Sequence, residues 1–171
     1  MIFMKKALIV IDVQNEYFEG GAFVLWNGEQ TLENIKKAIL AAQAAGAPVI
    51  LVRHAIKGET PFFGETTKGR QIRDDILAMV PDATPIIKYN ADVFYETDLD
   101  QVLQDLGVDE VILCGMMTHN CVLFSALSRD IEKYNPKVIP EACTTVNEII
   151  HMLALQGLAT RVPFVSVEEA F

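Results

Sequence analysis

Short apolar runs rich in β-branched residues recur along the chain, and most of the segments between them have helical periodicity. The first run extends from Ala7 to Ile11 and the second from Pro48 to Val52. Continuous runs of this kind are typical of parallel strands covered on both faces. Because strands and helices alternate, we predict a three-layer α/β/α fold with a mostly parallel, Rossmann-like sheet. About six strands are expected, at 7–11, 48–52, 85–88, 110–114, 137–140 and 162–165, with helices at 31–45, 71–79, 99–106, from 122 onward and at 146–155.

The composition indicates one globular domain and excludes several classes of function. The chain has 171 residues, of which 51% are hydrophobic, and its net charge is −9. This acidic balance argues against nonspecific nucleic-acid binding, which needs a basic surface. The longest apolar runs are too short to span a membrane, and the run after Lys6 ends at Asp12, as a first strand would. The three cysteines show no CxxC spacing, so we expect reduced thiols and a cytoplasmic location.

Three chemically different residues follow or end three of the predicted strands. Asp12 follows the first strand, Lys88 ends the third, and the turn 115–121 after the fourth contains Cys121. The carboxyl ends of parallel strands meet at one edge of a sheet, so these residues are expected to lie together. A cysteine nucleophile needs a base and a positive neighbour, and a helix N-terminus also lowers a thiol pKa. Asp12 would accept the thiol proton, while Lys88 would lower the thiol pKa.

Each of these residues also has a structural interpretation. Cys121 alone is compatible with simple packing in the core, and Asp12 with capping of the following turn. His54, after the second strand, either lines a pocket or makes a structural hydrogen bond. The loops 19–26 and 58–69, with Phe62 and Phe63 in the second, are candidates for a pocket wall.

Three motifs in this order resemble the isochorismatase-like cysteine hydrolases, which include nicotinamidases and N-carbamoylsarcosine amidohydrolases. The resemblance covers most of the chain, from Ala7 to about Leu155, so we treat residues 1–171 as one hydrolase domain. The matching pieces are Leu8-Ile9-Val10-Ile11-Asp12-Val13-Gln14-Asn15 with Phe18, Lys88 with Ala91 and Phe94, and Gly115-Met116-Met117-Thr118-His119-Asn120-Cys121-Val122.

The resemblance implies an Asp–Lys–Cys triad of Asp12, Lys88 and Cys121. Cys121 would attack the carbonyl carbon of a small amide or carbamoyl compound and form an acyl-enzyme, which water hydrolyses. The family's cis peptide would lie between Met116 and Met117. The N–H groups of Met117 and Cys121 would then stabilise the oxyanion, a type of interaction worth roughly 100-fold or more in rate. We expect the substrate-binding residues to include Phe18, His54, Phe63 and Met116.

The chain also departs from the resembled family. Nicotinamidases carry an Asp-x-His metal motif after the second strand, but the run Arg53-His54-Ala55-Ile56 contains no aspartate. We therefore expect no bound metal and no cofactor, and we reject a plain nicotinamidase. Isochorismatases that cleave a vinyl ether lack the cysteine, so Cys121 favours hydrolysis of a C–N bond.

Two other classes of function remain open at this stage. One is a non-enzymatic binding or assembly protein on the same fold, which would not need Lys88 beside a thiol. The other is a thiol-redox protein, for which no resolving cysteine lies near Cys121 in the sequence. The expected partners are a small-molecule substrate and further copies of the chain, since the resembled proteins are usually dimers or larger. No nucleic acid or membrane partner is expected.

Overall fold

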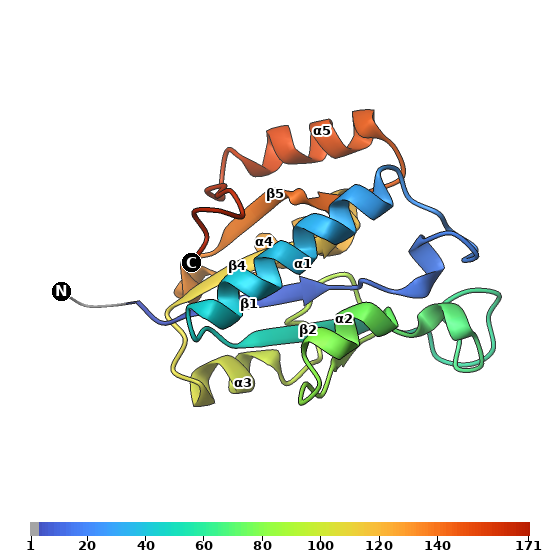
Figure 1. Ribbon diagram of the computed structural model, residues 1–171, viewed down its shortest axis with the longest axis horizontal. Helices are drawn as coiled ribbons and strands as arrows, with labels where there is room; N and C mark the ends of the chain where they lie inside the picture. Colours follow the sequence, from blue (N-terminus) through green and yellow to red (C-terminus); the bar gives the residue numbers. More distant parts are fainter. Residues whose placement is uncertain (1–3) are drawn as a thin grey trace.

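The computed structural model describes residues 4–171 and contains one parallel sheet of five strands (Figure 1). The strands are β1 (Lys6–Ile11), β2 (Val49–His54), β3 (Ile86–Lys88), β4 (Glu110–Met116) and β5 (Lys137–Thr144). Their spatial order is β3-β2-β1-β4-β5, so β1 lies at the centre and the chain reverses direction across the sheet between β3 and β4. Ligands bind at such switch points in open parallel sheets.

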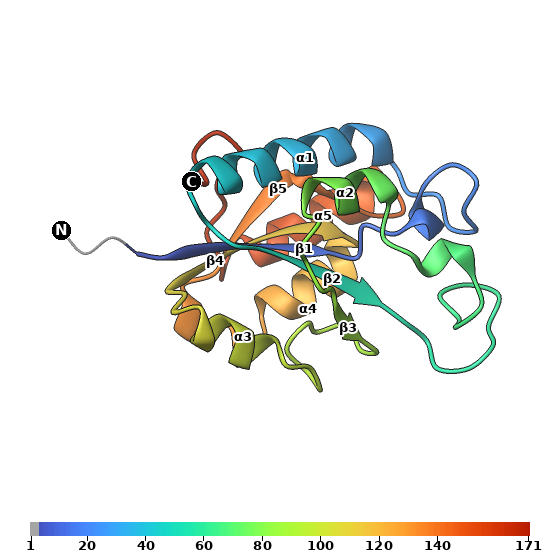
Figure 2. The same ribbon diagram turned by 60° about the horizontal axis from the view of Figure 1, so that its bottom comes forward.

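Helices cover both faces of the sheet (Figure 2). The helices α1 (Gly28–Ala44) and α2 (Asp74–Met79) lie on one face, and α3 (Leu99–Asp105) and α4 (Leu123–Ala126) on the other. The last helix, α5 (Glu148–Leu158), shares the second face through Leu158. Short helical turns complete the set, of the 3-10 type at Asn15–Tyr17, Lys68–Arg70 and Glu132–Tyr134 and of the π type at Thr118–Val122.

Alternating side chains of the central strand enter two separate hydrophobic clusters. Leu8 and Val10 pack with the α1 residues Leu32 and Ile35 on one face. Ala7, Ile9 and Ile11 pack with the side chains of α3, α4 and α5 on the other face. This two-sided burial explains why β1 has a continuous apolar run instead of an alternating one. The predicted three-layer α/β/α fold is thus confirmed.

Several predicted element boundaries were wrong. The expected strand at 162–165 is reduced to a single bridge between Val138 and Phe164. The fifth strand does not end at 140. An irregularity in its pairing with β4, between Leu113 and Gly115, lets it continue to Thr144. The first helix begins at Gly28, after Asn27 in a left-handed conformation, and not at Thr31 as predicted.

The final helix also differs at both ends. It begins at Glu148, where the side chain of Asn147 accepts a hydrogen bond from the Ile150 N–H at 2.9 Å. It then continues through Gly157 to Leu158, beyond the predicted end at 155. Among residues 4–171, no helix is sufficiently long and apolar to cross a membrane.

Candidate active site

Four strand ends bring polar side chains to the same edge of the sheet. Asp12 directly follows β1, His54 and Lys88 are the last residues of β2 and β3, and the turn after β4 carries Cys121. The register pairs His54 with Lys88, and the Asp12 N–H donates to the carbonyl of Val52 at 3.0 Å. Parallel pairing therefore places residues that are far apart in the sequence around one point, as the strand pattern predicted.

The turn that carries Cys121, residues 115–121, depends on a close approach between β4 and β1. Gly115 has φ +123°, and a Cβ atom there would lie 2.1 Å from the carbonyl oxygen of Ile11. Only glycine fits both conditions. The Met116–Met117 peptide bond is cis, at the position where the resemblance places one. The π-helical turn then begins at Thr118, and Cys121 lies within the first turn of this helical segment.

Polar contacts with α5 and with the end of β5 hold this turn in place. The hydroxyl oxygen of Thr118 lies 2.9 Å from Nδ1 of His151 on α5. Nδ1 of His119 lies 2.6 Å from the hydroxyl oxygen of Thr145, just beyond β5. Both histidines thus support the backbone around Cys121.

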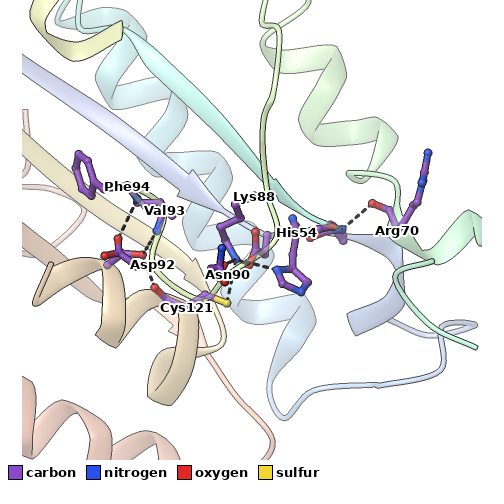
Figure 3. Close-up of polar contacts among 11 residues, drawn as sticks. His54, Arg70, Lys88, Asn90, Asp92, Val93, Phe94 and Cys121 are labelled. Carbon is purple, nitrogen blue, oxygen red and sulfur yellow. Dashed lines mark hydrogen bonds and ion pairs between the residues drawn. The ribbon is translucent and has the colours of Figure 1, made fainter. Parts of the chain in front are cut away.

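The ammonium of Lys88 is the centre of the site. Its Nζ lies 2.8 Å from Oδ2 of Asp12 and 3.2 Å from Sγ of Cys121. It also lies 3.1 Å from the carbonyl oxygen of Asn90 and 3.2 Å from Nδ1 of His54 (Figure 3). The side chains of Asp12 and Lys88 are fully buried, and Cys121 is 3% exposed. A carboxyl group, an ammonium and a thiol therefore meet away from bulk water.

The prediction that the site lowers the thiol pKa was wrong. Burial, followed by the negative charge of Asp12, raises the pKa of Cys121 to about 12, and the opposing effect of Lys88 is smaller. Burial acts to lower the pKa of Lys88, but Asp12 and Cys121 together raise it above its usual value. The resting site therefore contains a thiol and an ammonium beside the Asp12 side chain.

A cavity of about 200 Å³ opens beside the thiol. Its wall is mostly apolar and includes four Phe or Tyr side chains, while His54, Asn120 and Cys121 contribute polar groups. The lining residues are Tyr17, Phe23, His54, Ile56, Phe62, Phe63, Ala91, Met117, Asn120 and Cys121.

Two of the predicted substrate-binding residues line this cavity and two do not. His54 and Phe63 line it, with their rings edge to face and the centroids 5.6 Å apart. Phe18 is buried in the core, with the guanidinium of Arg73 4.6 Å from its ring centroid. Met116 is fully buried as the last residue of β4. Phe18 and Met116 are therefore corrected to core residues.

Sequence reasoning missed Tyr17 and Asn120. Tyr17 lies in the 3-10 turn after β1, where burial, followed by the nearby charge of Asp12, raises its pKa. Asn120 precedes Cys121 and lines the same cavity. Their positions in the two motif segments were the only available signal, because turns have no periodicity from which the direction of a side chain can be predicted.

The segment after β2 does not fit a metal centre. Nδ1 of His54 faces the Lys88 ammonium, and Arg53 donates to the Gln71 side chain at 2.9 Å. Within residues 4–171 no group of three or more His, Cys, Asp or Glu side chains is arranged to hold an ion. A positive charge next to an imidazole nitrogen disfavours a second cation there.

Comparison with known proteins agrees with the fold and the motifs. The family model of the isochorismatase domain matches residues 6–169. The isochorismatase family protein YddQ of Bacillus subtilis is 36% identical over 143 residues, which cover 83% of this chain and 79% of YddQ. The nicotinamidase of Escherichia coli is 25% identical over 179 residues, covering 83% and 84% of the two chains. The chain belongs to the isochorismatase family and is a hydrolase of that family.

Solved structures show the same fold. The nicotinamidase PncA of Bacillus subtilis superposes with a TM-score of 0.86 at 22% identity, over 95% of this chain and all of PncA. At that identity the likeness shows the fold alone.

Proposed function

We propose that the protein hydrolyses a C–N bond in a small amide or carbamoyl compound, with Asp12, Lys88 and Cys121 as its catalytic triad. The observation that carries this proposal is the single ammonium that contacts both the Asp12 carboxylate and the Cys121 sulfur in a buried site. Relatives that are named as nicotinamidases and as a ureidoacrylate amidohydrolase support the same class of substrate.

In the first half-reaction the thiol proton moves to Asp12 while Sγ attacks the carbonyl carbon of the bound substrate. This transfer converts a carboxylate and a thiol into a carboxylic acid and a thiolate, so the charge of the triad does not change. That neutrality matters, because losing the proton to water would leave a net negative charge in a buried site. Lys88 stabilises whichever partner carries the negative charge, because its Nζ contacts both.

Backbone groups of the nucleophile turn complete the proposed machinery. The developing oxyanion would accept hydrogen bonds from the N–H groups of Met117 and Cys121. No acceptor among the described residues takes the Met117 N–H, which leaves it free for this role. Asp12 then gives its proton to the leaving nitrogen, and the C–N bond breaks to leave a thioester on Cys121. A water molecule, deprotonated by Asp12, attacks this thioester, and the acid departs while Cys121 regains its proton.

Release of ammonia from a panel of small amides, carbamates and ureido acids tests this function. We expect release by the wild-type protein and none by Cys121→Ala. Cys143→Ala is the matched control, because Cys143 is also buried but lies on β5, outside the cavity. Release that continues in Cys121→Ala would refute the proposed nucleophile. The thiol-redox alternative is disfavoured because sensor cysteines have low pKa values, whereas that of Cys121 is raised.

We also propose that the protein forms a homo-oligomer of two or more copies. The α5 side chains Ile149, Met152 and Leu153 are 72%, 62% and 62% exposed, at the spacing of one helix face. Phe124 and Leu127 are exposed on and just after the neighbouring helix α4. Sedimentation should show a dimer or larger species that dissociates in Met152→Glu/Leu153→Glu, whereas a wild-type monomer at micromolar concentration would contradict the proposal. A cytoplasmic location is proposed with it, because catalysis needs Cys121 reduced.

A further inference from the structure

His54 links the catalytic lysine to the cavity. Its backbone is fixed by Gln14, whose side-chain oxygen accepts from the His54 N–H and whose amide nitrogen donates to the His54 carbonyl, both at 2.9 Å. Its ring packs edge to face on Phe63 and lines the cavity together with Cys121. Figure 3 shows the ring beside Lys88, with one nitrogen toward the ammonium. The position of the imidazole is therefore defined from several sides.

The contact with Lys88 determines where the imidazole carries its proton. An ammonium can only donate, so Nδ1 of His54, 3.2 Å from Nζ, is placed as an acceptor that shares the three N–H groups of Lys88 with Asp12, Cys121 and the Asn90 carbonyl. A hydrogen on Nδ1 would instead point at a positive charge. A neutral imidazole then has its single proton on Nε2. Burial and the Lys88 charge lower the pKa of His54, opposed only by the more weakly acting Asp12, which favours the neutral ring. Within residues 4–171 no group accepts a hydrogen bond from Nε2, so this donor is available to a molecule in the cavity.

We propose that His54 is a specificity-determining residue, which donates a hydrogen bond from Nε2 to an acceptor atom of the substrate while Lys88 holds its Nδ1. The cavity wall is otherwise mostly apolar and aromatic, so a donor of fixed direction discriminates strongly there. The site then prefers amides that carry a second acceptor, such as a carbonyl, a carboxylate or a ring nitrogen, and disfavours protonated amines. This inference rests on the proposed function for the reaction, but the tautomer does not depend on it.

Nitrogen-15 NMR of the full chain without ligand tests the tautomer. The chain has three histidines, so loss of one signal set in His54→Asn assigns the residue. At neutral pH we expect an unprotonated Nδ1 and a protonated Nε2. In Lys88→Met, which removes the donor to Nδ1, the two tautomers should become mixed. A proton on Nδ1, or on both nitrogens, in the wild-type protein would overturn the inference even if the protein is an active hydrolase.

Two substitutions separate the contact with Lys88 from the contact with substrate. In His54→Asn the amide lies near the position of Nδ1, so it can accept from Lys88 but has no donor at the position of Nε2. In His54→Gln the longer side chain reaches the position of Nε2 and supplies a donor to the cavity. For a substrate with a second acceptor, we expect KM to rise about 10- to 100-fold in His54→Asn with a smaller change in kcat, and His54→Gln to recover most of the loss.

Matched compounds complete the test. The three pyridinecarboxamide isomers and benzamide have nearly the same shape and differ by one ring nitrogen. They are compared as substrates and as protectors of Cys121 against iodoacetamide. One isomer should exceed benzamide by about tenfold or more in the wild-type protein, and His54→Asn should abolish the difference. Equal behaviour of all four compounds in the wild-type protein, or an unchanged KM in His54→Asn, would overturn the proposed role.

Discussion

Replacing Asp12 with asparagine should make the Cys121 thiol more reactive toward an alkylating reagent while it abolishes turnover. The substitution changes little else, because asparagine also tolerates the left-handed conformation of residue 12, where φ is +54°. It removes one negative charge and leaves the Lys88 ammonium beside the sulfur. The thiol then ionises toward a positive neighbour without the opposing carboxylate.

The size of the effect follows from the geometry. Oδ2 of Asp12 and Sγ of Cys121 lie 2.8 Å and 3.2 Å from the same nitrogen, so they are at most 6.0 Å apart (2.8 + 3.2). At an effective dielectric constant of about 20, two unit charges at about 6 Å repel by about 3 kcal/mol, or about two pKa units. The pKa of Cys121, now raised to about 12, should therefore fall to about 10.

Below both pKa values the thiolate fraction would rise about 100-fold. Because a less basic thiolate is intrinsically a weaker nucleophile, by about tenfold for two units, the net alkylation rate should rise about tenfold. Loss of the general base should lower turnover by at least about 100-fold. The rate is measured with iodoacetamide at pH 8 by mass spectrometry of the Cys121 peptide.

Asp100→Asn, which removes a carboxylate from a surface pair with Lys133, is the matched control and should change neither quantity. Alkylation of Asp12→Asn that is slower than in the wild-type protein would refute the electrostatic argument. Turnover retained at more than about one hundredth of the wild-type rate would refute the assignment of Asp12 as the base.

Three further predictions concern stability. Gly115→Ala should lower both the urea midpoint and turnover, because its Cβ would collide with the backbone of β1. The control Gly46→Ala, which has open space around it, should lower the free energy of unfolding by about 1 kcal/mol and leave turnover unchanged. Lys88→Met should reduce the free energy of unfolding by about 3–5 kcal/mol, because it leaves the buried Asp12 carboxylate unpaired. In urea titrations, the double variant Lys88→Met/Asp12→Asn should regain most of this loss. Burial lowers the pKa of His54 and His151, so the unfolded chain binds more protons and stability should fall as the pH drops below about 6.5; a urea midpoint equal at pH 7.5 and 5.5 would contradict this.

The arrangement of the triad was predictable from the sequence because it depends on a simple rule. Once Ala7–Ile11 and the later apolar runs are recognised as parallel strands, Asp12, Lys88 and Cys121 must come to the same edge of the sheet. The order of the strands and the register between β2 and β3 then bring these residues within contact distance. The exact position of Cys121 also depends on the turn after β4, which requires Gly115.

The cavity wall and the state of the thiol were not predictable in the same way. Tyr17 and Phe18 are adjacent, yet Tyr17 faces the cavity and Phe18 packs against Arg73, a choice made by the 3-10 turn and its tertiary contacts. The raised pKa of Cys121 results from how completely the fold buries it, and a sequence pattern contains no measure of that burial. A local sign such as a helix N-terminus was therefore misleading here.

The three cysteines differ in how a solvent-borne reagent can reach them. Their labelling rates can therefore report two different opening motions of the same molecule. Cys121 borders the cavity, whereas Cys114 and Cys143 are buried within β4 and β5. A small thiol reagent needs only access to the cavity to modify the first, but it needs separation of the central strands to modify the other two. Pulse labelling would thus compare local opening of the site with global unfolding within one molecule, and the ratio of the two rates would show how independently the site moves from the sheet that forms it.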